Sequence, residues 1–354
     1  MTLSHAARRP GLIVLTACGL GIGAGAFASR SEAADATATA PAPQAPPQPT
    51  PTAPVAPLSP AGRPAAKPAP KETVERLELT TSDGRTIAAW CYLVPEDAAP
   101  LGSVILLHDL GGSHRTVEPL AKALQAAGCI VVAPDLRGHG ESGTDRERDD
   151  PAKVLKRPDF EAMAASRGGQ KRDQADVVGD VESVYAWLRQ RLGETQGRVP
   201  LVVVGSGLGA AVAAQWTLAD ARWPDTTSGP QGCDVDGLVV ISPPFASKGF
   251  PMNTSLAQEP LLRSLPIVFC AGTADRDAGR VFDQMKAKRP KAWYDSRNAG
   301  SSPSKAAEAT LLMLAHPAAV KADELAATRS NDPRDPAPAV VIPEFVRKLA
   351  AQAR

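Results

Sequence analysis

The amino-acid sequence predicts an α/β protein with a mainly parallel central sheet and helices on both faces. Apolar runs at residues 130–133, 201–204 and 267–270 are hydrophobic at every position, as expected of strands buried on both faces. Segments with helical spacing separate these runs, which favours parallel strands joined by crossover helices. In residues 72–96, by contrast, apolar and polar residues alternate on either side of a Ser-Asp-Gly turn at residues 82–84. This pattern predicts an antiparallel hairpin at the start of the sheet.

The other elements follow in order along the chain. After the hairpin over 72–96, we expect a strand and glycine turn over 102–112, a helix over 116–129, and a strand and exit loop over 130–142. A helix over 173–192 and a strand, turn and helix over 200–215 follow. The remaining strands are expected over 236–244, 265–275 and, last, 291–296, and the remaining helices over 304–327 and 342–353. The charged and patternless residues 144–172 predict an inserted loop with one helical turn. Residues 241–253 predict a small or vestigial cap.

The first 72 residues predict export rather than a folded core. Residues 1–28 have a basic start, a short apolar centre and a small-residue end, which is typical of a secretory signal peptide. Within them, residues 15–18 (Leu-Thr-Ala-Cys) also resemble a lipobox, in which Cys18 would carry lipid and provide the one route to a membrane. Residues 29–72 are rich in Pro, Ala and Thr and predict a disordered linker. Residues 73–354 then form one domain, in a periplasmic, secreted or envelope-tethered protein.

Charge and cysteine spacing exclude several classes of partner. The formal net charge is +1 and no basic face is visible, so no nucleic acid is expected as a partner. The five cysteines are scattered singly, without the spacing of a zinc site, and we expect neither a metal nor a cofactor. Asp173, Asp176 and Asp180 fall near one helical face, where a solvated helix N-terminus is expected.

Three segments together resemble the α/β-hydrolase family, over essentially all of residues 73–354. They are "LLHDLGGS" at 106–113, "APDLRGHGES" at 133–142 and "VVVGSGLGAA" at 202–211. The resemblance implies a nucleophile at the apex of the turn after residue 204, in a small-x-nucleophile-x-small pattern. It also implies oxyanion-binding amides from Asp109 or Leu110 and from Leu208. The orienting acid would be Asp275, in "AGTADRD" at 271–277, and a histidine would follow the last strand.

The sequence departs from this pattern at two of the three catalytic positions. With Gly205 and Gly209 as the small residues, the apex is Gly207, which has no hydroxyl group. Ser206 would be the nucleophile only in a shifted frame that puts bulky side chains at both small positions. After the expected last strand, Ser301 or Ser302 stands where the histidine belongs. The sequence therefore predicts a non-catalytic protein that binds a small molecule, an envelope component or a protein.

Two alternatives stay open at this point. The first is an active serine hydrolase with a non-standard constellation, such as Ser206 with Asp275 and His316. The second is a dinucleotide-binding protein, because Gly205-x-Gly207-x-x-Ala210 fits a relaxed fingerprint between a strand and a helix. The remaining histidines are expected to be structural at His108 and His139, and exposed at His114.

Overall fold

A computed structural model describes residues 73–95, 97–166, 179–195, 199–223, 232–247, 250, 252–256, 264–289, 292–298, 306, 309–330, 332 and 336–353. The predicted signal peptide, the lipidation site at Cys18 and the linker lie outside these residues. None of the helices in the described part of the chain combines the length and the hydropathy of a bilayer span.

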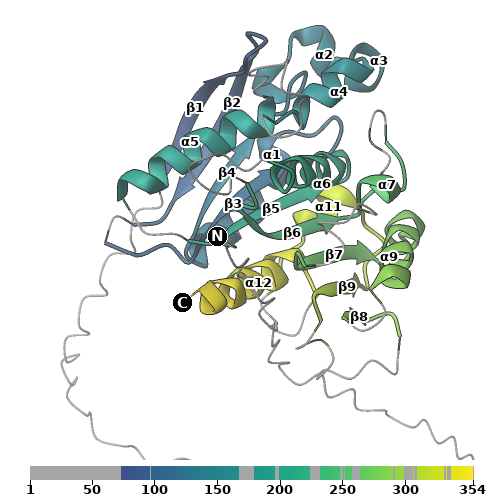
Figure 1. Cartoon of the computed structure of the whole chain (residues 1–354). Coiled ribbons are helices and arrows are strands. Elements are labelled where there is room, and N and C mark those ends of the chain that lie inside the picture. The colour runs from purple at the N-terminus through teal and green to yellow at the C-terminus, as the bar shows by residue number, and fades with distance from the viewer. Residues whose placement is uncertain are drawn as a thin grey trace, which may run out of the picture. The chain divides into compact units, whose positions relative to one another are not determined.

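The described residues form one sheet with the strand order β1-β2-β4-β3-β5-β6-β7-β9-β8. In Figure 1 the sheet runs from β1 and β2 at the upper left to β8 at the lower right. The strands are β1 (Thr73–Thr80), β2 (Thr86–Leu93), β3 (Gly102–Leu107), β4 (Cys129–Pro134), β5 (Leu201–Ser206), β6 (Val235–Ile241), β7 (Ile267–Gly272), β8 (Trp293–Asp295) and β9 (Leu311–His316). The pairs β1–β2 and β2–β4 are antiparallel, and the other pairs are parallel. The predicted antiparallel start and parallel centre are thus confirmed.

Helices cover both faces of this sheet. They are α1 (His114–Ala126), α2 (Asp145–Asp149), α3 (Pro151–Val154), α4 (Arg157–Met163), α5 (Asp180–Thr195), α6 (Leu208–Asp220), α7 (Met252–Leu256), α9 (Arg276–Lys288), α11 (Ala322–Ala326) and α12 (Pro338–Ala353). Side chains of α5, α6 and α9 share one core cluster with Ile105 and Leu107, whereas α1, α11 and α12 share the other with Val104 and Leu106. This alternation along β3 puts one hydrophobic layer on each face, because successive strand side chains point to opposite sides.

The end of the sheet differs from the sequence prediction. Residues 291–296 do contain a strand, β8, but it lies at the edge and is not the last one. The last strand is β9, which inserts between β7 and β8. The prediction of a helix over 304–327 was therefore wrong for 311–316. Alanine and leucine favour a helix locally, but six successive residues that can be buried between two strands gain more from completing the sheet.

One other expectation also needs correction. The part of 144–172 that is described holds three short helices, α2 to α4, in place of a loop with one helical turn. Phe160 and Met163 of α4 are buried in the core, which supplies the stabilisation that the charged sequence did not suggest. The predicted cap falls partly outside the described residues, and its described part includes α7 and a bridge between Ser247 and Phe250.

Candidate functional site

The centre of the sheet carries a tight turn between β5 and α6. Gly207 occupies this turn with φ 52° and ψ −116°, and its N–H donates to the carbonyl oxygen of Ile241 over 2.9 Å. A positive φ of this kind is open to glycine, which lacks the Cβ that would clash with the backbone. The residue at the apex of the turn is therefore Gly207, and Ser206 is the last residue of the strand before it.

The glycines on either side of the apex allow the strand and the helix to approach closely. A Cβ on Gly205 would overlap the carbonyl oxygen of Gly209. A Cβ on Gly209 would lie 2.5 Å from the carbonyl oxygen of His108 and 2.6 Å from that of Leu107. Because these neighbours are backbone atoms, they cannot rotate out of the way. The backbone packing thus requires glycine at both positions and holds α6 against the end of β3.

The space next to Gly207 is filled by the carboxylate of Asp109, which follows β3. Its Oδ1 accepts hydrogen bonds from the N–H of Leu110 over 2.7 Å and from the N–H of Leu208 over 2.6 Å. A Cβ on Gly207 would overlap this carboxylate. Burial raises the pKa of Asp109, although the two N–H groups oppose that shift. Asp109 therefore stands where a side chain of residue 207 would need to lie.

A second carboxylate, that of Asp323 on α11, adjoins the first. Its Oδ1 accepts from the N–H of Asp109 over 3.0 Å, and its Oδ2 accepts from the hydroxyl of Thr116 on α1 over 2.5 Å. Burial raises the pKa of Asp323, against the opposing effects of Thr116, Ser206 and the Asp109 N–H. All three amides that the sequence predicted as oxyanion donors are consequently bonded to carboxylates.

Ser206 lies beside this pair but has a different environment from an apex residue. Its side chain has no solvent exposure, and Oγ completes no hydrogen bond with a described residue. The hydroxyl is nevertheless close enough to Asp323 to favour the charged form of that carboxyl, as the direction of its effect on the pKa shows. No ring nitrogen of a described residue bonds to it. The structure thus places Ser206 next to a carboxylate.

The acid position of the sequence analysis, Asp275, lies at the end of β7 as the N-cap of α9. Its Oδ1 accepts from the N–H of Ala278 over 3.2 Å, and the Lys321 ammonium lies 3.6 Å from the same oxygen. Among the described residues no histidine bonds to Asp275. His316 ends β9 nearby, at the register position opposite Gly272, and its Nδ1 accepts from the N–H of Ala318 over 3.1 Å.

The other histidines in the described part of the chain are buried. His108 Nε2 accepts from the N–H of Leu136 over 3.0 Å, and burial lowers the pKa of His108. His114 was expected to be exposed, but this was wrong: its ring stacks on Trp90 and its Nδ1 lies 3.0 Å from Asp135 Oδ1. The chain turns here at the start of α1, so the ring covers the end of the sheet.

His139 belongs to the loop after β4. Its Nδ1 lies 3.0 Å from the carbonyl oxygen of Arg137, and its Nε2 has no hydrogen-bond partner among the described residues. Burial, with a smaller effect of His108, lowers the pKa of His139 to about 4. This ring is therefore neutral near neutral pH, although it lies close enough to Asp323 to affect that carboxyl.

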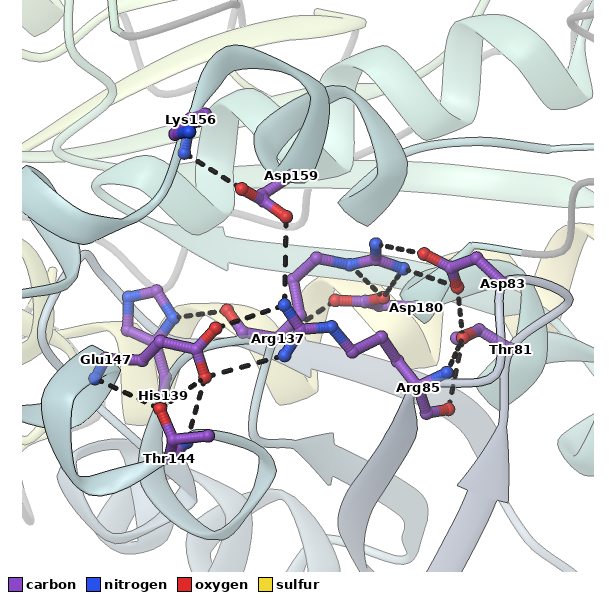
Figure 2. A network of polar contacts seen from close by, with 10 residues as sticks. All are labelled: Thr81, Asp83, Arg85, Arg137, His139, Thr144, Glu147, Lys156, Asp159 and Asp180. Atoms are coloured by element: carbon purple, nitrogen blue, oxygen red, sulfur yellow. Dashed lines mark hydrogen bonds and ion pairs between the residues drawn. The ribbon is translucent and has the colours of Figure 1, made fainter.

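A buried ion pair holds this loop in place. Figure 2 shows Arg137 between Asp180 and Asp83, with His139 on the neighbouring turn. The Arg137 guanidinium lies 2.7 Å from Asp180 and from Asp83, and both Arg137 and Asp180 are almost wholly buried. Asp180 does begin helix α5, as predicted, but the expectation that it is solvated was wrong. Its carboxylate is the internal partner of Arg137, while Asp173 and Asp176 lie outside the described residues.

Sequence reasoning missed the role of the Asp109 side chain and missed Asp323 altogether. The signal for Asp109 was present, because the family's turn has glycine after the histidine and this chain has an aspartate. The signal for Asp323 was weaker. A five-residue apolar run at 311–315, followed by His316 and Pro317, is of strand length, and reading it as a strand would have put Asp323 just beyond the carboxyl edge of the sheet.

Comparison with known proteins identifies the fold family. The family model described as "Alpha/beta hydrolase family" matches residues 104–353, which is most of the chain. This protein belongs to the alpha/beta hydrolase family. The matched range contains Asp109, Gly207, Asp275 and Asp323, so the family assignment covers the whole candidate site.

Individual relatives of this alpha/beta hydrolase are distant. A thermostable monoacylglycerol lipase from Bacillus sp. (strain H-257) is 33% identical over 92 residues, which are 26% of this chain and 27% of the lipase. An esterase from Pyrococcus furiosus is 17% identical, with a TM-score of 0.38, over 61% of this chain and 79% of the esterase. A dienelactone hydrolase from Anabaena variabilis is 14% identical, with a TM-score of 0.43, over 61% of this chain and 81% of the hydrolase.

Proposed function

We propose that this alpha/beta hydrolase is an exported protein that binds a ligand without hydrolysing it. The ligand would be a small molecule, a component of the cell envelope or another protein. The main support is the Asp109 carboxylate, which accepts hydrogen bonds from the Leu110 and Leu208 amides beside Gly207. A protein that lacks a hydroxyl at the apex and fills its oxyanion-binding amides internally has the fold of a hydrolase without the parts that acyl transfer needs.

The energetics of hydrogen bonding favour this arrangement over substrate binding. A hydrogen bond to a charged acceptor contributes about 1.5–3 kcal/mol, whereas one to a neutral acceptor contributes about 0.5–1.5 kcal/mol. An ester carbonyl would have to displace the Asp109 carboxylate from two amides at once. Because Asp109 belongs to the same folded chain as both amides, it loses no translational entropy when it binds them. These contributions favour the internal carboxylate over an ester carbonyl as the acceptor for the two amides.

The general base is the second missing part. A serine hydroxyl becomes a good nucleophile when a neighbouring imidazole takes its proton. The Ser206 hydroxyl has no hydrogen bond to a ring nitrogen of a described residue, and the Nδ1 of His316 already accepts the Ala318 amide. The carboxyl of Asp275 caps α9 and lies near the Lys321 ammonium. These contacts support a structural role for both residues.

An active hydrolase remains the second candidate, and one observation favours it. The buried Ser206 hydroxyl has a hydrogen-bonding capacity that no described residue uses. A rearrangement that brought a base to Ser206 would give it a catalytic role. The dinucleotide alternative has less support, since the Leu208 amide at the start of α6 is already bonded to Asp109 and the strand β6 is followed by Ser242 in place of an acidic residue.

The two candidates are separated by covalent labelling. The full-length protein is treated with a fluorophosphonate probe and assayed on short-chain nitrophenyl esters, alongside Ser206→Ala. We expect neither labelling nor turnover above the uncatalysed rate in either protein. The double variant Gly207→Ser/Asp109→Ala restores a hydroxyl and vacates the amides, and we expect it to remain inactive because no described residue places an imidazole in hydrogen-bond contact with this turn. Labelling of the wild type that Ser206→Ala abolishes would disprove the proposal.

Export has its own test. Residues 1–28 and Cys18 carry this part of the proposal, and both lie in the N-terminal segment outside the described residues. Fractionation of cells that express the full chain should recover the protein outside the cytoplasm, with residues 1–28 removed. A Cys18→Ser variant distinguishes the lipoprotein alternative, because only a lipidated protein would lose membrane attachment on this change. A full-length protein retained in the cytoplasm would disprove export.

A further inference from the structure

We propose that Asp109, Asp323 and Ser206 bind the primary ammonium group of an organic ligand. This inference rests on the proposed binding function and names the chemistry that the site would recognise. Asp109 and Asp323 are both partly exposed, whereas Ser206 is fully buried beside them. A ligand group would therefore meet the carboxylates at the surface of the site and the hydroxyl at its base.

The negative charge at this site is not balanced by a described side chain. Neither Asp109 nor Asp323 has a Lys, Arg or His nitrogen within 4.0 Å among the residues that the structure describes. The ammonium of Lys321, which precedes Asp323 by two residues, lies 3.6 Å from the carboxyl of Asp275. His139 is neutral at neutral pH, because its pKa is lowered to about 4. Two half-buried carboxylates without a cationic partner are unfavourable, and a bound cation relieves that cost.

The acceptors that remain open fit the donors of a primary ammonium. Both amides that bond to Asp109 use Oδ1, so its Oδ2 receives no hydrogen bond from a described residue. The Asp323 oxygens accept one hydrogen bond each, which leaves lone pairs on both. Ser206 Oγ is buried and has no hydrogen-bond partner among the described residues. These residues supply four oxygen acceptors, enough for the three N–H donors of a primary ammonium.

The amide contacts also explain why the site would prefer a cation to an anion. The Leu110 and Leu208 amides are the groups that would otherwise attract a carboxylate or a phosphate to the start of α6. Because Asp109 already occupies them, an incoming anion would find neither amide free and would face two negative charges. The same contacts fix the Asp109 carboxylate in one orientation, with Oδ2 on the side that carries no bond. The site is thereby organised before the ligand arrives.

The test is isothermal titration of the full-length protein near neutral pH and at constant ionic strength. The probes are ethylammonium, tetramethylammonium, acetate and calcium, each as a simple salt. We expect saturable binding of ethylammonium, and binding of tetramethylammonium at least about tenfold weaker, because tetramethylammonium has the charge but no N–H donor. Acetate and calcium should not compete with ethylammonium.

Variants assign the binding to these residues. Asp109→Asn and Asp323→Asn keep the shape of each side chain and remove its charge, so each should weaken ethylammonium binding at least about tenfold. Ser206→Ala should weaken it by a smaller factor of about three to ten, since it removes one neutral acceptor. Asp145→Asn is the matched control, because the Asp145 side chain is 93% exposed on α2 and should leave binding unchanged.

Several outcomes would overturn the inference. They are the absence of saturable ethylammonium binding, equal binding by all four variants, and tighter binding of acetate or calcium than of ethylammonium. The proposed function fails separately, by fluorophosphonate labelling that depends on Ser206. A chain that binds ethylammonium through Asp109 and also hydrolyses esters would disprove the function and keep the inference. A chain that does neither would keep the absence of hydrolysis and disprove the ammonium site.

Discussion

The coupling between Gly207 and Asp109 gives the sharpest prediction about stability. The variant Gly207→Ala adds one methyl group at the apex of the turn between β5 and α6. That methyl would overlap the Asp109 carboxylate, and the residue would hold a φ of 52° with a side chain present. Both effects destabilise the fold, but only the first depends on Asp109. The two contributions can therefore be measured separately.

The magnitude follows from the contacts. A non-glycine residue in a sparsely populated conformation costs about 1–3 kcal/mol. Displacing Asp109 breaks its hydrogen bonds to the Leu110 and Leu208 amides. Hydrogen bonds to a charged group contribute about 1.5–3 kcal/mol each when fully buried. Because this carboxylate is partly exposed and is rehydrated when displaced, we take the net contribution of both bonds together as about 2 kcal/mol. We expect Gly207→Ala to lower the unfolding free energy by about 3–5 kcal/mol. Asp109→Ala alone should lower it by about 2 kcal/mol.

The assay is a double-mutant cycle measured by urea unfolding. The double variant should be about as stable as Gly207→Ala alone, since the hydrogen bonds of Asp109 are lost in both, and the coupling energy should be about 2 kcal/mol. Gly111→Ala is the matched control. Gly111 also has a positive φ, of 80°, but a Cβ there meets nothing within 4 Å, so strain of about 1–2 kcal/mol is its whole effect. Additivity of the two changes within about 0.5 kcal/mol would refute the reasoning.

Three further predictions concern stability. Burial raises the pKa of Asp220 from 3.8 to about 6, so the protonated carboxyl is favoured in the native state. The stabilisation from this group is complete below the pKa of the unfolded state. It is lost as the pH rises through about 6. Asp220→Asn should remove about 2–3 kcal/mol of this pH dependence, measured as unfolding free energies at about pH 4 and about pH 7, and an unchanged dependence would contradict the assignment. Arg137→Ala leaves the carboxylate of Asp180 buried without its cationic partner, and should lower the unfolding free energy measured in urea by about 3–5 kcal/mol. Adding Asp180→Asn should recover part of this loss. A loss under about 1 kcal/mol would count against the ion pair. Gly209→Ala places a methyl group 2.5 Å from a backbone carbonyl oxygen, and should lower the melting temperature by an amount equivalent to about 3 kcal/mol of unfolding free energy. A Cβ at Gly193 on α5 would meet nothing within 4 Å, so Gly193→Ala should leave the stability unchanged or raise it. Equal effects of these two glycine substitutions would argue against the close approach of α6 to β3.

The fold was predictable from the sequence because its signals are local. Strands such as β5 are apolar at every position, and the alternation of β1 differs from them visibly. The crossover helices carry their own spacing, as in α1, where the buried residues recur every three or four positions. The glycines at 205, 207 and 209 also located the turn after β5, since few other sequences allow so close a contact between a strand and a helix.

The order of the last strands was less accessible. Residues 311–316 have a composition that suits a helix, and only their place between β7 and β8 makes them a strand. The error mattered for the site as well as for the fold. It placed the end of the sheet near residue 296, so the histidine was expected at Ser301 or Ser302, and His316 was considered only as an alternative base within an expected helix. In the structure the chain leaves the sheet after His316, and the residue that then approaches the apex is Asp323.

The sequence by itself determined the class of fold, the position of the turn at Gly207 and the absence of a hydroxyl group there. These properties depend on the identity and spacing of neighbouring residues. Only the tertiary structure decided what occupies the space beside Gly207. Asp109 and Asp323 are separated by more than two hundred positions, and they meet because β3 and β9 end at the same edge of the sheet, from which α1 and α11 both depart. Contacts of this range depend on the packing of the whole domain, so no local pattern records them.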